Sequence, residues 1–262
     1  MTRFHLGLLA TMALAAHASS AAAADLTVGA NIGNVPWEFE DASGNYVGFE
    51  IDLVNEVTGS LGKTVEFENI PFNGLFAAVQ SGRIDLAISS ITITEKRLES
   101  VSFAQPYYDS DQSLTVRADS GIASLDDLQG KVVAVDTGST GDIWATEHQG
   151  EYGIADIRRF EGLNPAMLDL AAGRIDGYIS DIPALLYYTK DKPDLQVVQR
   201  ILTGEKYSMM FAKDSALATE VNDVLTQLKK EGVIADLHEK WFGAVPEDDT
   251  TTVMVVDMPA TK

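Results

Sequence analysis

The segments GRIDLAISS (residues 82–90) and GRIDGYISD (residues 173–181) carry the same residue at six of nine positions. Each begins at a glycine that ends an amphipathic helical pattern, and each continues into a strand-like run. An earlier strand with a polar, glycine-containing loop precedes each of these helices. Strands that alternate with helical patterns predict βαβ units and a mostly parallel sheet. The duplication therefore predicts an α/β chain with two similar lobes.

The residues at the end of the first copy, SITITEKR (residues 90–97), combine hydroxyl groups with an arginine. Arginine presents a planar fork of donors that matches the two oxygens of a carboxylate, so Arg97 and its neighbours suit a small carboxylate ligand. The same pattern is typical of a strand–turn–helix junction in which Thr94 caps the helix and Arg97 is a solvated surface charge. The stretch by itself leaves both interpretations open.

The register of the repeat places Ser90 and Asp181 at equivalent strand ends. Ligands of open α/β sheets bind beyond the carboxyl ends of the strands, and two lobes whose strand ends face each other would enclose a cleft. The polar loops after the first strand of each lobe add side chains to the same edge. The predicted cleft residues are Asn31, Asn34, Ser90, Thr92 and Arg97 from the first lobe, and Asp136, Ser139, Thr140 and Asp181 from the second.

The composition argues against several classes of function. The chain of 262 residues has a net charge of −20, which disfavours nucleic acids because their phosphates would be repelled. It contains no cysteine, so disulfides, thiolate catalysis and cysteine metal sites are excluded. Outside the first 24 residues its histidines are His148 and His238, which stand far apart, so we expect no metal site, no catalytic triad and no cofactor. The charge predicts a self-repelling monomer.

Residues 1–24 have the pattern of a secretory signal peptide. Arg3 supplies a positive start, residues 6–16 are an apolar run, and the alanines at 21–24 suit a cleavage site. No cysteine follows that would make the product a lipoprotein. We expect a mature chain that begins at Asp25 and resides in the periplasm.

Several stretches together carry a family resemblance: YVGFEIDL (46–53), IDLAISSITITEKR (84–97), FAQPYY (103–108), LQGKVVAV (128–135) and KWFG (240–243). In this order, over residues 26–243, they resemble the periplasmic amino-acid-binding proteins of ABC uptake systems, which form family 3 of the solute-binding proteins, and within it the polar and basic amino-acid group. The resemblance implies a type II periplasmic-binding-protein clamshell. Such a clamshell closes on a free amino acid and presents it to a membrane permease.

The two-lobed fold that the resemblance implies also divides the chain. The expected parts are a discontinuous first lobe (25–108 and 207–245), a second lobe (112–202), hinges near 108–111 and 203–207, and a polar tail (246–262). The tail contains one apolar patch, at 253–256. An added edge strand and a disordered tail are both compatible with that patch.

The resemblance further implies roles for the cleft residues. Arg97 would pair with the α-carboxylate of the ligand, together with backbone N–H groups around Thr92 and Thr140. Ser90, Thr92 and Asp181 would hold the α-ammonium, which needs acceptors and a counter-charge. Phe72 stands where an aromatic ring of the family covers the ligand side chain. The alternative for Phe72 is a core residue beside a helix.

The sequence departs from the family where ligand specificity is decided. The loop after the first strand often carries an aspartate and an aromatic residue in the family, whereas this chain has Asn31 and Asn34. The loss of a carboxylate at Asn31 weakens the prediction of a lysine or arginine ligand, while Asp136 disfavours an acidic ligand. Two amides favour a neutral polar amino acid slightly and leave a basic one possible. Turn chemistry is an equal explanation for both asparagines.

Three functions are compatible with these features. The leading hypothesis is a non-enzymatic solute-binding protein that works by hinge closure. An exported dehydratase of a cyclic amino-acid precursor shares the scaffold and would need a positioned acid or base in the cleft. A ligand-sensing component of a receptor is the third. No histidine falls in the predicted cleft loops, which makes the enzyme the weaker alternative.

Overall fold

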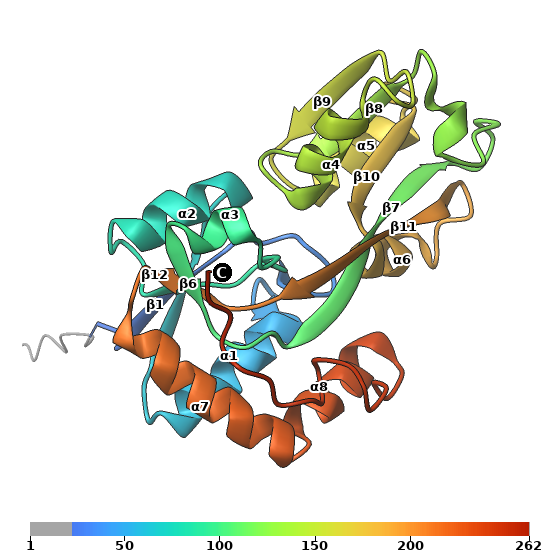
Figure 1. Cartoon of the computed structure of the whole chain (residues 1–262). Helices are drawn as coiled ribbons and strands as arrows, with labels where there is room; N and C mark the ends of the chain where they lie inside the picture. Colours follow the sequence, from blue (N-terminus) through green and yellow to red (C-terminus); the bar gives the residue numbers. More distant parts are fainter. Residues whose placement is uncertain (1–22, 262) are drawn as a thin grey trace, which may run out of the picture.

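The computed structural model describes residues 23–261, and these residues form two five-stranded sheets flanked by helices (Figure 1). The predicted signal peptide lies outside the described residues except for residues 23 and 24. The first sheet has the order β4 (Val65–Asn69), β1 (Leu26–Ala30), β5 (Leu86–Ala87), β12 (Met210–Ala212), β6 (Val101–Phe103). The second has the order β11 (Leu195–Tyr207), β7 (Tyr108–Arg117), β10 (Gly177–Asp181), β8 (Val132–Asp136), β9 (Asp156–Phe160).

The two sheets share one topology, which confirms the predicted duplication. β1 pairs in parallel with β4 and β5, and β8 pairs in parallel with β9 and β10. An antiparallel strand from elsewhere in the chain then pairs with the third strand of each set, β12 with β5 and β7 with β10. Two βαβ units with the same strand order therefore underlie the two repeated segments.

The shared aspartate of the repeat explains why the motif occurs twice. The Asp85 carboxylate accepts from the Thr27 backbone N–H (2.7 Å), and the Asp85 N–H donates to the Thr27 carbonyl (2.8 Å). Asp176 makes the same two bonds with Val132, both of 2.8 Å. Each aspartate thus fastens the start of the third strand to the first strand of its own sheet. The repeated motif therefore has a structural role, and the candidate ligand-binding residues stand at or after its last position.

Helices cover both sheets, with a short hairpin beside the first. The elements beside the first sheet are α1 (Phe49–Ser60), α2 (Phe72–Gln80), α3 (Glu95–Leu98), α7 (Ala216–Lys230), α8 (Val233–Phe242) and the hairpin of β2 (Phe39–Glu40) and β3 (Tyr46–Val47). With the second go the 3₁₀ helix η1 (Leu125–Leu128), α4 (Thr140–His148), α5 (Leu163–Ala171) and α6 (Ile182–Thr189). No helix within residues 23–261 is long and apolar enough to cross a membrane.

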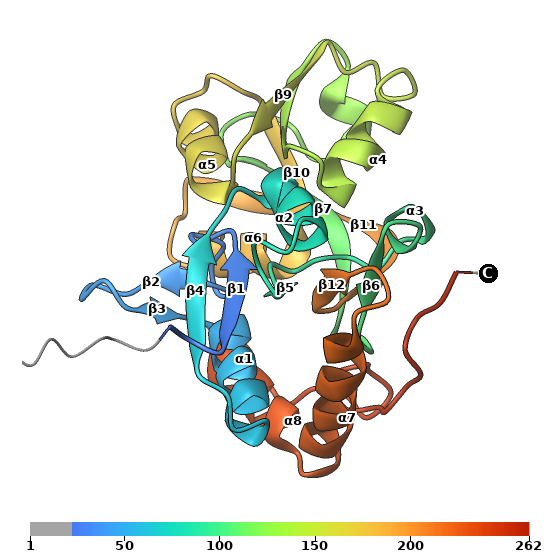
Figure 2. The ribbon, with the colours of Figure 1, turned by 90° about the vertical axis from the view of Figure 1, so that its left-hand side faces the viewer.

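The chain passes between the two sheets along β7 and β11. These strands pair antiparallel from Tyr108 opposite Tyr207 to Arg117 opposite Leu195, with register shifts between Val197 and Gln199 and between Ile201 and Glu205. Figure 1 shows them side by side between the part with α1, α7 and α8 and the part with α4, α5 and β9. Figure 2 shows α2 at the junction of the two parts. The expected connector near 203–207 belongs to one continuous strand, β11.

Trp37 stands at the foot of this crossing in the larger core. The indole is fully buried and meets the rings of Tyr108 and Tyr207 edge-on, with centroids 4.6 and 5.5 Å away. Edge-to-face pairs of buried aromatic rings stabilise a core beyond their area alone. The start of β7 and the end of β11 are therefore packed firmly onto the first lobe.

The C-terminal tail docks against the first lobe and the start of β7. The Thr251 N–H donates to the Asp109 carboxylate (2.6 Å), and Lys229 of α7 donates to the Met254 carbonyl (2.9 Å). Residues 246–261 contain no strand. The apolar patch at 253–256 is thus neither an edge strand nor a free end, because these bonds hold it as an irregular segment.

Candidate ligand-binding site

One pocket lies between the strand ends of the two sheets and gathers nine of the ten residues that the sequence singles out, all but Arg97. Its cavity volume is only about 30 Å³, because polar side chains of the two lobes contact each other across it. The lining residues are Asn31, Asn34, Phe72, Ser89, Ser90, Thr92, Asp136, Ser139, Thr140, Leu163, Ser180 and Asp181.

Ser90 and Asp181, equivalent in the repeat, meet across the pocket. The Ser90 hydroxyl donates to Asp181 Oδ2 (3.1 Å) and accepts from the Asn34 amide (3.1 Å). Ser90 has a φ of +42°, a left-handed conformation that is uncommon for a residue with a side chain. Loss of hydration and the nearby charge of Glu205 raise the pKa of Asp181 to about 7. This corner offers acceptors and a titratable negative charge.

Arg97 is buried, so the surface-charge interpretation is wrong. Its guanidinium donates to the carbonyls of Thr92 (2.7 Å) and Gly138 (3.3 Å) and lies 5.4 Å from the Phe72 ring centroid and 5.1 Å from that of Phe76. Burial lowers the pKa of Arg97 to about 10, which leaves it cationic at neutral pH.

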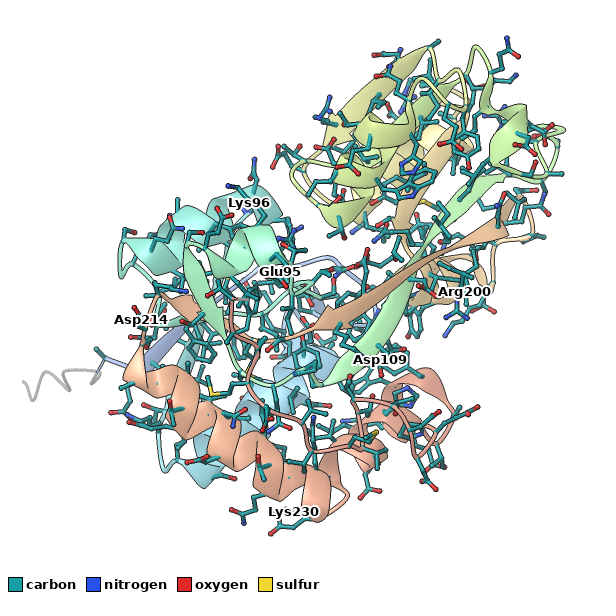
Figure 3. The ribbon with its side chains drawn as sticks, viewed as in Figure 1. Glu95, Lys96, Asp109, Arg200, Asp214 and Lys230 are labelled. Carbon is teal, nitrogen blue, oxygen red and sulfur yellow. The ribbon has the colours of Figure 1, made fainter. Side chains whose placement is uncertain are left out.

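The neighbours of Arg97 show that the short helix α3 is amphipathic. Thr94 caps it as predicted, since its hydroxyl accepts from the Arg97 N–H (3.1 Å). Lys96, labelled in Figure 3, lies at the outer surface of the helix with an 86% exposed side chain. The capped helix therefore places Arg97 inward and Lys96 outward. Thr94 is a helix cap, as the alternative interpretation predicted, but Arg97 is buried.

The N-terminus of α4 faces Arg97 from the second lobe. Ser139 caps this helix by accepting from the Asp142 N–H (3.1 Å), and Thr140 is its first residue. The first N–H groups of a helix have no intrahelical acceptor and favour anions. Gly141 is required here, because a Cβ atom would come within 2.9 Å of the Ile179 carbonyl oxygen. Arg97 and this helix end together suit a carboxylate.

Two residues of the crossing strands bond to side chains that line the pocket, and sequence reasoning missed both. Glu205 of β11 accepts from the hydroxyls of Thr92 (2.7 Å) and Thr140 (3.0 Å), one from each lobe. Gln112 of β7 donates to Asp181 (2.6 Å) and to Glu205 (3.0 Å). No motif marks them, because their orientation follows from the register of β7 against β11.

Asn31, Asn34 and Phe72 lie on the first-lobe wall. The turn-chemistry explanation holds for the backbone, since the N–H groups of Gly33 and Asn34 both donate to the Glu38 carbonyl (2.9 and 3.0 Å). The Asn34 side chain nevertheless faces the pocket and bonds to Ser90. Phe72 is only partly buried and lines the pocket, so it is not a pure core residue.

Asp136 lies on the opposite wall at the end of β8. Its Oδ2 accepts from the Tyr178 hydroxyl (2.8 Å), while its buried Oδ1 has no partner among the described residues. Burial raises the pKa of Asp136 to about 6. A buried carboxylate oxygen without a donor is costly, so this atom suits a donor on a ligand. Within residues 23–261 no group of three or more acidic or histidine side chains could hold a metal ion.

Comparison with known proteins agrees with this geometry. The family model of the bacterial extracellular solute-binding proteins, family 3, matches residues 26–244. The arginine-binding extracellular protein ArtP of Bacillus subtilis is 32% identical over 83% of this chain and 86% of its own length. The L-cystine-binding protein TcyJ of Escherichia coli is 31% identical over 80% of this chain and 79% of its own.

A solved structure extends the likeness to the fold. The arginine-, lysine-, histidine-binding protein ArtJ of Geobacillus stearothermophilus has a TM-score of 0.79 and 33% identity, over 86% of this chain and 97% of its own. The expected type II clamshell is therefore confirmed. The matched family and these relatives are binding proteins and not enzymes, so the dehydratase alternative has no support.

Proposed function

Because the chain belongs to the bacterial extracellular solute-binding proteins of family 3, we propose that it captures a free amino acid and delivers it to the permease of an ABC importer. The observation that carries the proposal is the pairing of two unlike corners across one pocket. Ser90 and Asp181 form an acceptor corner, while Arg97 and the N-terminus of α4 form a donor corner. A free α-amino acid carries an ammonium and a carboxylate on the same carbon atom and so matches both corners.

The α-ammonium would take the place of the direct Ser90–Asp181 contact. It would donate to the Asp181 carboxylate, the Ser90 hydroxyl and the Thr92 hydroxyl. The α-carboxylate would accept from Arg97 and from the first N–H groups of α4. Charge-assisted bonds of this kind are shorter and stronger than neutral ones, and they fix orientation as well as affinity.

The charges around the pocket reverse the slight preference for a neutral polar ligand that the two asparagines gave in the sequence. Asp136, Asp181 and Glu205 contribute three carboxyl groups, and Arg97 is the one cation among these site residues. A ligand that is only zwitterionic leaves this excess of negative charge uncompensated, whereas a cationic side chain aimed at Asp136 Oδ1 reduces it. We therefore place basic amino acids before neutral polar ones, although Asn31 and Asn34 suit either.

Lobe motion would occur where the chain crosses between the sheets. We propose lobes at 25–108 with 207–245 and at 112–202, joined by hinges near 108–111 and 203–207. The second hinge coincides with the register shift between Ile201 and Glu205. An amino acid that bridges Ser90 and Asp181 would stabilise the closed form. Residues 1–24 would direct a monomeric chain to the periplasm.

Ligand screening tests this function. The mature chain from Asp25 onward would be heated with each free amino acid in turn, and hits would be titrated by calorimetry. We expect one or more basic amino acids to raise the melting temperature, because a ligand at a hundred times its Kd stabilises the folded state by about 2.7 kcal/mol. Mass spectrometry of the recovered ligand checks that it is unchanged. If no α-amino acid raises the melting temperature, the proposal fails.

A further inference from the structure

Two glutamates lie directly behind the acceptor corner, outside the pocket lining. Glu38 and Glu50 are both fully buried. Glu50 belongs to the first turn of α1, and Glu38 follows the turn that carries Asn34. Their carboxyl groups lie close enough to shift each other's pKa. Among the described residues, the buried Oε2 atom of each glutamate accepts no hydrogen bond, which leaves both atoms available to a shared proton.

A pair of this kind requires one proton between the two groups. Two ionised carboxylates are acceptors only, so they cannot bond to each other, and burial makes their repulsion severe. Burial and the charge of Glu50 raise the pKa of Glu38 well above its ordinary value. Burial also raises the pKa of Glu50, but less, because its interaction with Glu38 and the bonds from Tyr107 and the Ser90 N–H stabilise its charged form.

The Oε1 atoms of the two glutamates hold the acceptor corner in place. Glu50 Oε1 accepts from the Ser90 backbone N–H (2.8 Å) and from the Tyr107 hydroxyl (2.5 Å). Glu38 Oε1 accepts from the Ser89 hydroxyl (2.6 Å) and from the Asn34 amide (3.4 Å). A left-handed φ at a residue with a side chain persists only where its surroundings fix it. The Glu50–Ser90 bond supplies that restraint.

We propose that Glu38 and Glu50 share a single proton and, as one unit, position Ser89, Ser90 and Asn34 for the α-ammonium of the ligand. They are positioning residues, since neither lines the pocket. One other titratable group contacts the unit, Tyr107 from the segment before β7, and Asp181 of β10 lies one step further away, bonded to Ser90. At high pH the shared proton is lost, two buried anions repel each other, and the turn at Ser89–Ser90 is released. The ligand part of this inference rests on the proposed function; the shared proton does not.

The first test needs no ligand and compares Glu38→Gln with the wild type. In the variant an amide N–H can donate to Glu50 in place of the shared proton, while the amide oxygen still accepts from Ser89. The wild-type folded state retains a proton that the unfolded chain has lost, so its stability falls as the pH rises above the ordinary glutamate pKa and levels off above the folded-state pKa. We expect the melting temperature of Glu38→Gln to fall less steeply over that range.

The matched control is Glu56→Gln, which changes an exposed glutamate of the same helix, α1. It should keep the wild-type pH slope. Parallel curves for the wild type and Glu38→Gln would overturn the shared proton. Infrared spectra of the wild type at about pH 8.5 check the point without a variant, because Asp136 and Asp181 are then ionised. A protonated-carboxyl band supports the pair, and its absence overturns it.

The second test measures ligand affinity across pH. Glu38→Gln should bind within about threefold of the wild type at neutral pH, and Glu38→Ala at least about tenfold more weakly. At high pH, where the shared proton is lost, the wild type should lose affinity before Glu38→Gln. Identical affinity profiles would overturn the positioning role, even if the melting curves support the shared proton. If no amino acid binds at all, the proposed function fails, and the melting and infrared comparisons still decide whether the proton is shared.

Discussion

The two repeated corners of the molecule are alike up to their last residue and then diverge. In both, an aspartate (Asp85 or Asp176) fastens the third strand to the first. The first corner ends at Ser90, in a left-handed conformation with a buried glutamate behind its N–H. The second ends at Asp181, a carboxylate with no side-chain capping bond to α6. The arginine that follows the first corner, Arg97, has Tyr188 at the equivalent position of the second.

The difference separates what holds the fold from what binds a ligand. A duplicated anchor gives two similar sheets, and unequal strand ends give a pocket with a donor side and an acceptor side. A symmetric pair of corners would present the same groups twice and would not orient a zwitterion. Substitutions at both corners test whether the residues that differ, such as Arg97 and Asp181, bind the ligand, and whether the shared aspartates, Asp85 and Asp176, only stabilise the fold.

Removal of Arg97 should have the largest effect. Arg97→Ala takes away the buried cation of the donor corner, and we expect ligand affinity to fall at least about 100-fold, because loss of one partner of a buried, hydrogen-bonded charge pair is costly. Calorimetry measures the change. The control is Lys96→Ala, which removes an exposed cation paired only at the surface with Glu99. Equal affinities in the two variants would show that Arg97 has no part in binding.

Removal of the opposite charge should come next. Asp181→Asn leaves the ligand ammonium without its counter-charge, and we expect affinity to fall about 30- to 100-fold. The pKa of Asp181 is raised to about 7, so in the wild type affinity should increase as the pH rises toward that value and the carboxylate ionises. The variant should lack this dependence. A pH profile unchanged by the substitution would contradict the assignment.

The side-chain end of the pocket should show a smaller, selective effect. Asp136→Asn should weaken the binding of basic amino acids about tenfold and leave neutral polar ones nearly unchanged, since only a cation gains from the charge. Because the pKa of Asp136 is raised to about 6, the wild-type preference for basic ligands should decline below that pH. Competition titrations measure both. Equal losses for basic and neutral ligands would remove Asp136 from specificity.

The two equivalent aspartates of the repeat should behave alike. Asp85→Ala and Asp176→Ala each remove one bond to a backbone N–H, and we expect each to lower the free energy of unfolding by about 0.5–1.5 kcal/mol with little change in affinity. Urea unfolding measures both variants. A substantial loss of affinity in only one of them would mean that the anchors differ in function and would weaken the comparison.

The sequence predicted the duplicated part of this architecture well, because its signals are local. The Asp85 and Asp176 anchors act within one βαβ unit, and Thr94 caps the helix that it precedes. The register of the repeat alone paired Ser90 with Asp181, which do contact each other. Nine of the ten predicted site residues share one pocket, since strand ends of a parallel sheet meet at one edge.

The remainder depends on packing between distant segments. Glu205 and Gln112 reach the side chains of the pocket lining because of the β7–β11 register. No local pattern marks Glu38 and Glu50 as buried residues, and only the fold removes both from solvent. The tail is held by Asp109 and Lys229, bonds that no local pattern reveals.

The central claim, that two unlike corners clamp the backbone of an amino acid, is tested most directly by calorimetry with three related ligands. These are the basic amino acid that binds most tightly, the amine that lacks its α-carboxylate, and the derivative with an acetylated α-amine. We predict that the intact amino acid binds and that each altered ligand binds at least about 100-fold more weakly. Binding of either altered ligand within about threefold of the parent would contradict the clamp.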